Sequence, residues 1–594
     1  MLCLRGFIRE LQKTQEIVEV HEEVDPHLEI AEIHRRVAAA DGPALFFRRV
    51  RGSSFPVVTN LFGSKKRVNS AFHNRPEETL TELVRFFQEN MPPTLSKVWQ
   101  HRSLFKKILN VGLKKERSSG VLECSMDTPN LNRLPLLTSW PLDGGAFITL
   151  PLVYTEPVGG GPHNLGMYRI QRYNEKQAGL HWQIAKGGGF HFHEAELQNK
   201  SLPVNILLGG PPALILSAIT PLPENVPELL LCSFLQGKKL STVKAKESVY
   251  PLVKHCEFAL IGDAKPHERR LEGPFGDHYG YYSLEHDFPV FNCKKIYHRK
   301  DAIYPATVVG KPRQEDFYIG NYLQELLSPL FPLVMPAVKS LWSYAETGFH
   351  ALSAIVVNER YERECMTSAF RVLGEGQLSL TKFLLVTNQQ VDVKDIKALL
   401  KIVLERFQPE KDLFIFSNLS LDTLDYTGPS FNKGSRGVIL GVGDKVRDLQ
   451  DEFQGRLPSM IKRAKAFCPG CLVVEAGFGK EMNMQEIASY PSFAKWPLLI
   501  LVDSLEKTLR STASFLWTTF TRFEPAADIY SSKCHIYRNH LCHGAPILID
   551  ARMKPKYPQE VLVDDATSSL VTKRWNNYFP GGMPMGDSLS AHVS

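Results

Sequence analysis

Three stretches of this 594-residue chain concentrate residue types that can carry chemistry. In the first, residues 161–189, Asn164 and Arg169 lie five positions apart on either side of Gly166. Arg169 belongs to a strand-like run, in which alternate side chains share a face. The stretch ends in Lys186 and three glycines, and glycine-rich backbone beside a lysine can bind a phosphate. An ordinary β-hairpin with a glycine-rich turn explains the same pattern, so this motif alone leaves both interpretations open.

The second and third stretches add carboxylates. In residues 220–237, Glu228 begins an apolar, helix-like run. A glutamate is electrostatically favoured in a first helical turn, but it could also be an oxygen ligand for a divalent cation. In residues 271–282, Glu272 and Asp277 lie in a turn rich in glycine, proline and aromatic residues. Two carboxyl groups near one arginine can differ in pKa, which would suit one of them to donating a proton. A solvated acidic loop is the alternative.

Several domains must position these residues, because the chain is too long for one hydrophobic core. The pattern predicts an α/β region with a linker helix over residues 1–118. Residues 119–315 alternate short apolar runs with glycine and proline turns, which is typical of a barrel-like β domain, and they contain all three stretches. We expect an α/β domain over residues 316–450 and a C-terminal extension over residues 451–594.

An internal repeat indicates how the extension arose. Residues 406–409, RFQP, recur as RFEP at residues 522–525, which is 116 positions later, and further matches share that offset. We therefore predict that residues 380–415 and 496–531 superpose as two βαβ units. Chance similarity between two ordinary βαβ units is the alternative, but several matches at one offset favour duplication.

The overall composition is that of a soluble globular protein, with 43% hydrophobic and 22% charged residues. A net charge of +7 is small for this length and does not require a nucleic-acid partner. The most apolar run, residues 204–220, is broken by two glycines and two prolines, so we expect no transmembrane helix. The charged N-terminal stretch lacks a signal-peptide pattern, and ten scattered cysteines are typical of reduced thiols, so we expect a cytoplasmic protein.

Residues 99–117 form a basic segment, in which lysines, arginines and a histidine face a single acid. Basic amphipathic segments bind membrane surfaces or nucleic acids, but a solvated linker helix explains the composition equally well and is the interpretation we prefer. No recognised nucleic-acid module accompanies the segment. We therefore expect no nucleic-acid partner and at most peripheral contact with a membrane.

Cys468 and Cys471 form a CxxC motif. Zinc sites of this type use a second cysteine pair or a histidine pair with suitable spacing, which the chain lacks. A redox motif would begin a helix, whereas these cysteines lead into a strand-like run. We predict structural thiols that bind no zinc.

Taken together, NLGMYRIQ, GLHWQI, TPLPENVPE, EGPFGDHYGYY and DAIYPATVVGKP resemble the UbiD family of decarboxylases in their order and approximate spacing. Members of that family use prenylated FMN. The resemblance covers roughly residues 1–450, and the long C-terminal region is similar to members that act in menaquinone biosynthesis. The resemblance implies an N-terminal α/β region, a split β-barrel flavin-binding domain and a C-terminal α/β oligomerisation domain.

The resemblance also implies roles for individual residues. Asn164 and Glu228 match ligands of a divalent ion, with manganese preferred and potassium as a further candidate ion. Arg169, Glu272 and Asp277 match a catalytic arginine with two carboxylates, and we favour Asp277 as the proton donor. The matched cofactor contacts are Met167, Tyr168, Arg169, His181, Trp182, Gln183, Lys186 and Gly187. Whether His181 also helps to hold the metal is left open.

The function implied is non-oxidative decarboxylation of an aromatic quinone precursor, of the dihydroxynaphthoate type used for menaquinone. One alternative is a 3-polyprenyl-4-hydroxybenzoate decarboxylase of ubiquinone biosynthesis, and another is a flavin-binding oxidoreductase. A catalytically silent assembly subunit is a third, although the presence of Arg169, Glu272 and Asp277 argues against it. The implied partners are the aromatic acid, a flavin prenyltransferase as cofactor source, and further copies of the chain in a homo-oligomer.

Overall fold

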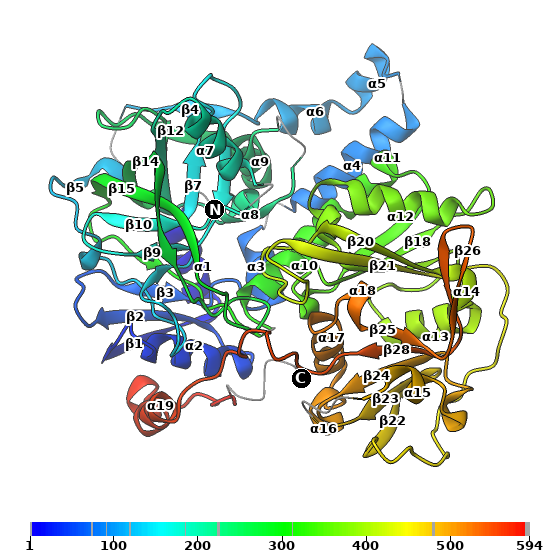
Figure 1. Ribbon diagram of the computed structural model, residues 1–594. Coiled ribbons are helices and arrows are strands. Elements are labelled where there is room, and N and C mark those ends of the chain that lie inside the picture. Colours follow the sequence, from blue (N-terminus) through cyan, green and yellow to red (C-terminus); the bar gives the residue numbers. More distant parts are fainter. Residues whose placement is uncertain are drawn as a thin grey trace. The chain divides into compact units, whose positions relative to one another are not determined.

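The computed structural model describes residues 3–72, 75–90, 92–117, 120–183, 186–222, 226–311, 313–477 and 482–587. The chain forms two compact units (Figure 1). Among the described residues, the first consists of 3–326 and 559–587, and the second of 327–558. None of the helices described is long and apolar enough to cross a membrane.

The first unit begins with a small α/β layer. A four-stranded sheet has the order β1-β2-β3-β16, and β1 runs parallel to β2. A parallel pair needs a crossover, which α2 supplies with a buried face containing Ile30, Ile33 and Val37. This confirms the predicted N-terminal α/β region. The elements are α1 (Leu4–Lys13), β1 (Ile17–Val24), α2 (Glu29–Ala39), β2 (Ala44–Val50), β3 (Val57–Thr59), α3 (Lys65–Ala71), α4 (Pro76–Glu89) and β16 (Tyr304–Pro305).

The centre of the first unit is a curled nine-stranded sheet in the order β6-β9-β10-β15-β14-β11-β7-β8, with β5 beside β15. Its strands are β5 (Cys124–Met126), β6 (Phe147–Ile148), β7 (Leu152–Thr155), β8 (Asn164–Met167), β9 (Ile170–Arg172), β10 (Gln177–Leu180), β11 (Leu202–Gly209), β14 (Cys256–Glu272) and β15 (His286–His298). The long β14–β15 ladder changes register at two places, and such bulges bend strands. This curvature confirms the predicted split-barrel domain.

The first unit also contains further helices and a small sheet. They are α5 (Leu95–Gln100), α6 (Arg102–Leu109), α7 (Gly187–Leu197), α8 (Pro212–Ile219), α9 (Glu228–Gln236) and α10 (Glu315–Leu327), together with β4 (Leu113–Lys115), β12 (Leu240–Val243) and β13 (Leu252–Val253). The three short strands form a sheet in the order β13-β12-β4.

The end of the chain returns to the first unit. Helix α19 (Asp565–Tyr578) packs on α2, and Trp575 and Phe579 join the main core of the unit. Arg36 of α2 donates to the Ser568 carbonyl at 3.0 Å, and Glu29 accepts from Arg574. No pattern in the sequence indicated that these residues complete the first unit.

The second unit contains two five-stranded sheets with the same strand order, β17-β18-β19-β21-β20 and β22-β23-β24-β28-β25. In each, three parallel strands are flanked by one antiparallel strand at either edge. The first sheet comprises β17 (Val338–Ser343), β18 (Leu352–Val357), β19 (Phe383–Thr387), β20 (Leu413–Ser420) and β21 (Lys433–Gly441). The second comprises β22 (Arg463–Cys468), β23 (Cys471–Glu475), β24 (Leu498–Val502), β25 (Ile529–Ser531) and β28 (Ile547–Asp550).

The matching strand order supports duplication and extends it beyond the predicted segments. Each segment has the expected order of strand, helix and strand: β19, α13 (Ile396–Arg406) and β20, then β24, α17 (Thr512–Thr521) and β25. The prediction of βαβ units is wrong in one respect. The second strand of each segment runs antiparallel to the first, with β21 or β28 between them. An apolar pattern marks a strand but carries no information on its direction.

The two cysteines of the CxxC motif face each other across the β22–β23 hairpin. Gly470 occupies the turn with φ +81°, a conformation that glycine adopts readily. Both cysteines are buried, and burial raises the pKa of the Cys471 thiol. The strand after Cys471 is as predicted, and the absence of zinc stays a prediction.

Candidate active site

Arg169 is the centre of a charged cluster in the first unit. It lies between β8 and β9, and its Nε donates to Glu272 Oε1 at 3.0 Å. Its Nη1 pairs with Asp277, and its Nη2 donates to Ser283 Oγ at 2.9 Å. The guanidinium lies 4.7 Å from the ring centre of Phe275. The structure therefore brings together the arginine and both carboxylates that the sequence singled out.

Each carboxylate also has a histidine. His181 Nδ1 lies 2.9 Å from Glu272 Oε2, and His278 Nδ1 lies 2.7 Å from Asp277 Oδ1. Burial alone would raise both carboxyl pKa values, but Arg169 and the adjacent histidine hold each of them below its usual value. The expectation that the two carboxyl groups differ in pKa, so that one suits proton donation, is wrong for this structure, because both lie against Arg169 and each also has a histidine beside it.

The carboxyl groups with raised pKa values lie beside this cluster. Burial raises the pKa of Asp143 to about 6, although backbone N–H groups of Ser139, Trp140 and Gly276 donate to its oxygens. Burial also raises the pKa of Asp316, which is within electrostatic range of Asp277 and His278. The sequence analysis did not identify Asp143, Asp316 or the pairing of His278 with Asp277. Only the pairing had a signal in the sequence, because His278 directly follows Asp277.

The loop that carries Asp277 is stabilised by hydrogen bonding within the loop and by hydrogen bonds to residues near the C-terminus. Asp277 N donates to the Tyr281 carbonyl at 3.0 Å. Tyr282 N donates to the Gln559 carbonyl at 2.9 Å, and Val561 N donates to the Gly280 carbonyl at 3.0 Å. Between these bonds, Glu560 pairs with Lys311 at 2.7 Å. Residues 559–561 thus form a short strand partner for the loop, which we call the C-terminal strap.

Glu228 and Asn164 form a second group of predicted site residues. The backbone N–H of Leu165, next to Asn164 on β8, donates to Glu228 Oε2 at 3.1 Å. Burial raises the pKa of Glu228 to about 7. Its histidine neighbour is His163, whose Nε2 lies 3.9 Å from Glu228 Oε2. Burial and nearby His191 lower the pKa of His163 to about 4, so this ring is neutral near pH 7.

Glu228 is a partly buried carboxylate without a paired cation among the described residues, and a metal ion would relieve that environment. The residues present therefore fit a divalent ion. No group of three His, Cys, Asp or Glu side chains that could hold a metal occurs in the described part of the chain. Asn164 and Glu228 would need further ligands, such as a cofactor phosphate or water. His181 faces Glu272 through Nδ1.

The glycine turn packs closely against the same side chains. A Cβ on Gly187 would lie 2.2 Å from Asn164 Oδ1, and one on Gly188 would lie 2.6 Å from Trp182 Nε1. Only glycine allows these approaches. Trp182 Nε1 is buried and has no hydrogen-bond partner in the described residues, which leaves a donor for a bound group. The turn follows Lys186 and opens the eleven-residue helix α7, whose N-terminus favours an anion.

The other predicted cofactor contacts lie around this turn. Tyr168 accepts at its Oη from Asn164 Nδ2 at 3.3 Å and from Gly188 N at 3.4 Å. Gln183 Nε2 lies 3.5 Å from His181 Nε2, and Met167 pairs with Leu152 across β8 and β7. The predicted residues therefore form two groups along β8, β9 and β10, one around Arg169 and one around Asn164.

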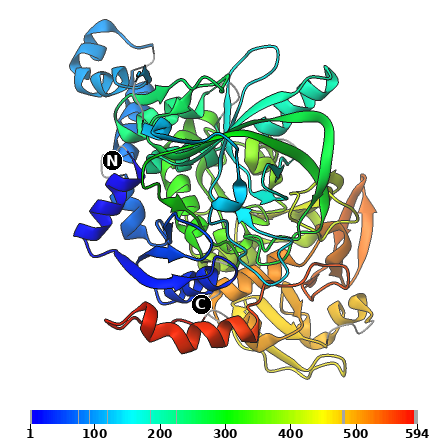
Figure 2. The same cartoon turned by 90° about the vertical axis from the view of Figure 1, so that its left-hand side faces the viewer.

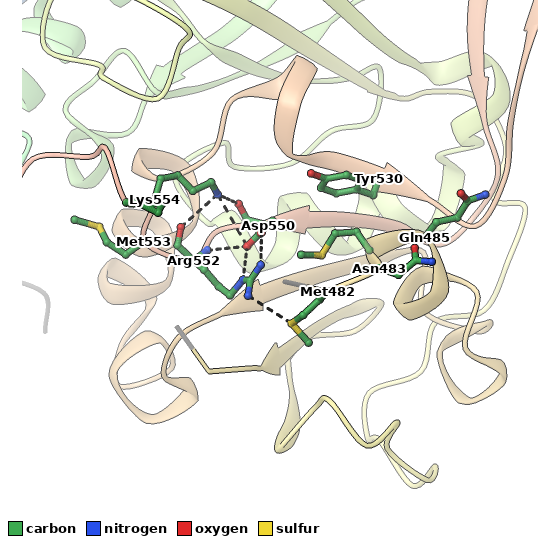
Figure 3. Close-up of a pocket in the computed structure, with 10 residues that line it drawn as sticks. Met482, Asn483, Gln485, Tyr530, Asp550, Arg552, Met553 and Lys554 are labelled. Atoms are coloured by element: carbon green, nitrogen blue, oxygen red, sulfur yellow. Dashed lines mark hydrogen bonds and ion pairs between the residues drawn. The ribbon is translucent and has the colours of Figure 1, made fainter. Parts of the chain in front are cut away.

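A separate cavity of about 900 Å³ lies at the second sheet of the second unit (Figure 3). Asp550 and Arg552 pair at 2.8 Å on its wall, and Tyr530 and Met482 also line it. None of the predicted site residues lines this cavity. We place the candidate active site in the first unit, because the paired charges and the glycine turn lie there.

The first unit thus combines a curled β-sheet, an arginine between two carboxylates, a glycine turn and a partly buried glutamate. Three family models described as 3-octaprenyl-4-hydroxybenzoate carboxy-lyase match the chain. They are the N-terminal domain at residues 8–87, the Rift-related domain at residues 114–312 and the C-terminal domain at residues 317–441. The chain belongs to the UbiD family of decarboxylases.

Relatives match over nearly the whole chain. A Chlamydia pneumoniae protein, whose name describes it as part of a 4-hydroxybenzoate decarboxylase, is 53% identical, covering 98% of this chain and 99% of the relative. An uncharacterised protein of Chlamydia trachomatis serovar D is also 53% identical, covering 98% of this chain and 100% of the relative. The match therefore includes the C-terminal strap and the duplicated sheet.

Solved structures agree with the fold. Vanillic acid decarboxylase of Sedimentibacter hydroxybenzoicus in its closed form matches with a TM-score of 0.66 and 24% identity, covering 77% of this chain and 95% of that one. The UbiD-class enzyme HmfF of Pelotomaculum thermopropionicum, solved with prFMN, matches with a TM-score of 0.61 and 21% identity, covering 74% and 95%.

Proposed function

We propose that the chain catalyses non-oxidative decarboxylation of an aromatic carboxylic acid with prenylated FMN. The observation that carries the proposal is the cluster in which Arg169 is held between Glu272 and Asp277. Further support comes from solved relatives, one described as a vanillic acid decarboxylase and one solved with prFMN. Bound prenylated FMN supplies the electron sink that loss of CO₂ from an sp² carbon requires.

The residues around Asn164 would hold the cofactor. Asn164 and Glu228 would bind a divalent ion, preferably manganese, against the cofactor phosphate, and potassium is a second candidate ion. Lys186 and Gly187 would bind the phosphate side. Trp182 Nε1 offers a buried donor, and Met167, Tyr168, His181 and Gln183 complete the proposed contacts.

Electrostatics suggests how the cluster obtains its proton. Arg169 and two ionised carboxylates carry one net negative charge when both histidines are neutral. An aromatic carboxylate that enters this field adds a further negative charge, so binding of the anion favours uptake of one proton by the site. His278, whose side chain is 27% exposed, can exchange that proton with water and pass it to Asp277. The product carbon then takes the proton as CO₂ leaves, which balances the reaction.

Two substrate types are in keeping with this chemistry. A dihydroxynaphthoate-type acid of menaquinone biosynthesis is our first candidate. A 3-polyprenyl-4-hydroxybenzoate is the second, and the name of the Chlamydia pneumoniae relative and the family description favour it. We further propose a cytoplasmic homo-oligomer that receives its cofactor from a flavin prenyltransferase.

The proposal can be tested with protein co-produced with a flavin prenyltransferase. The absorption spectrum and mass of the extracted cofactor should be those of prenylated FMN, and the loaded protein should release CO₂ from one of the two acid types. Asp277→Asn should retain cofactor but slow deuterium incorporation into the product, whereas Arg169→Ala should impair cofactor contact and turnover. Full activity in both variants would remove the cluster from the mechanism.

A further inference from the structure

The basic segment forms two short helices and a strand in the structure. We call residues 92–117, which contain α5, α6 and β4, the basic projection. Its apolar side chains are exposed to an unusual degree: Leu95 is 90% exposed, Trp99 71% and Leu109 78%. No residue of α5 is buried. In both ribbon views, α5 and α6 stand out from the sheet of the first unit (Figures 1 and 2).

The projection is nevertheless anchored. Leu104 of α6 is buried, and the rings of Phe105 and Phe86 meet edge to face at 5.1 Å. Helix α6 thus packs on α4 through one face, while Leu109 and the two exposed residues of α5 lie outside that contact. An anchored helix that still exposes large apolar side chains is typical of an interaction surface.

Basic residues are interspersed with these apolar residues along the projection. The basic side chains of the projection are Lys97, Arg102, Lys106, Lys107, Lys114, Lys115 and Arg117. Its one acid, Glu116, is already paired with Lys114 at 3.1 Å and with Lys254. Lys107 lies 3.7 Å from Glu82, and the Arg102 guanidinium lies 5.7 Å from the Trp99 ring centre. Among the described residues, the others form no ion pair with an acid.

The projection is joined to the candidate cofactor site. Strand β4 pairs in parallel with β12, and Gly112 N donates to Ser233 Oγ of α9 at 2.9 Å. Helix α9 begins at Glu228, the candidate metal ligand. Leu230 in the first turn of that helix is 38% exposed. A partner bound at the projection would therefore contact a segment that is itself joined to α9, the helix that begins at Glu228.

We propose that the basic projection binds the surface of a bilayer with anionic headgroups. Trp99, Leu95 and Leu109 would enter the interfacial region, and the lysines and arginines would lie at the headgroups. Tryptophan prefers this interface, and leucine gains by leaving water there. A nucleic acid would account for the charges but offers no comparable place for exposed leucines. The proposal concerns binding and does not depend on the proposed reaction.

Vesicle cosedimentation of the full chain tests the proposal. Binding to phosphatidylcholine vesicles should require added phosphatidylglycerol and should weaken as salt screens the charges. The double variant Leu95→Ala/Trp99→Ala should lose at least tenfold in partitioning, because it removes the interfacial side chains. Lys106→Gln and Lys115→Gln should each lose about fivefold, in line with the usual contribution of one basic residue at an anionic surface.

Two matched control variants distinguish binding at this surface from non-specific vesicle binding by exposed leucine and lysine side chains. Leu197→Ala removes a leucine that is 76% exposed on α7, and Lys200→Gln removes an exposed lysine; both should bind vesicles like the unmodified chain. Circular dichroism should show that all variants fold. Equal loss in the control variants, or no binding to anionic vesicles, would overturn the proposal. So would salt-sensitive binding to a DNA or RNA oligonucleotide that needs the same lysines but not Leu95 or Trp99.

Discussion

The ion pair between Lys311 and Glu560 offers a sharp test of the C-terminal strap. Replacing Glu560 with Gln keeps the size of the side chain and removes its charge, and Lys311→Met removes the other partner. Both changes leave Arg169 and Asp277 untouched. We expect each to loosen the loop that carries Asp277, because the pair lies between the two backbone hydrogen bonds that join strap and loop.

The expected coupling free energy of the Lys311–Glu560 pair follows from how far the two side chains are buried. The side chains of Lys311 and Glu560 are 11% and 30% exposed, and their charged atoms lie 2.7 Å apart. Exposed pairs contribute roughly 0.2–1 kcal/mol, whereas breaking a buried pair costs about 3–5 kcal/mol. A coupling of ~1–2 kcal/mol is expected for this intermediate case. Since about 1.4 kcal/mol is a factor of ten in rate, a loss of that size would lower kcat/KM by roughly fivefold to thirtyfold.

A double-mutant cycle measures the coupling. The unfolding free energy and the kcat/KM for decarboxylation would be determined for the unmodified chain, both single variants and the double variant. Lys294→Gln is a suitable control, because Lys294 forms a pair of similar length, 2.8 Å, with Asp263 but is 62% exposed. If the two single effects simply add, or if kcat/KM is unchanged in every variant, the strap does not support the loop.

Three further outcomes are expected. Trp575→Ala should destabilise the first unit by ~3–5 kcal/mol in urea unfolding, whereas Leu570→Ala on the exposed face of the same helix should cost less than about 0.5 kcal/mol. Burial raises the pKa of Asp143 from 3.8 to about 6, so ionisation of this carboxyl is destabilising. Relative to Asp143→Asn, the chain should therefore lose roughly 1–2 kcal/mol of unfolding free energy between pH 5 and pH 8. A difference between the two that is independent of pH would contradict this. Elemental analysis should find no zinc bound by Cys468 and Cys471, and one zinc per chain that is lost in Cys471→Ser would show the opposite.

Local patterns predicted much of this molecule, and the failures share a cause. The periodicity of apolar residues located the α/β and β regions, because it reflects which face of an element is buried. It could not predict that β20 runs antiparallel to β19, since strand direction depends on partners distant in sequence. The proximity of Arg169 to Glu272, 103 positions away, was likewise accessible only through the family resemblance.

The electrostatic prediction failed at a finer scale. Both acids were named correctly as neighbours of Arg169, but the pKa of each is lowered by Arg169 first and then by an adjacent histidine ring. His181 and His278 each turn a nitrogen to within hydrogen-bonding distance of one acid. Residue types and spacing do not encode that rotation, so the prediction of one raised and one lowered pKa had no structural basis.

The division of the first unit between the two ends of the chain has a consequence for biosynthesis. Arg169, Glu272 and Asp277 leave the ribosome early, but the strap and α19 emerge only after the whole of the second unit. At roughly 5–20 residues per second, that delay lasts on the order of tens of seconds. Throughout it, the core that Trp575 and Phe579 complete stays open. A prematurely terminated chain would therefore carry the charged cluster without the segment that holds its loop, and we expect such products to be exposed to proteolysis rather than active.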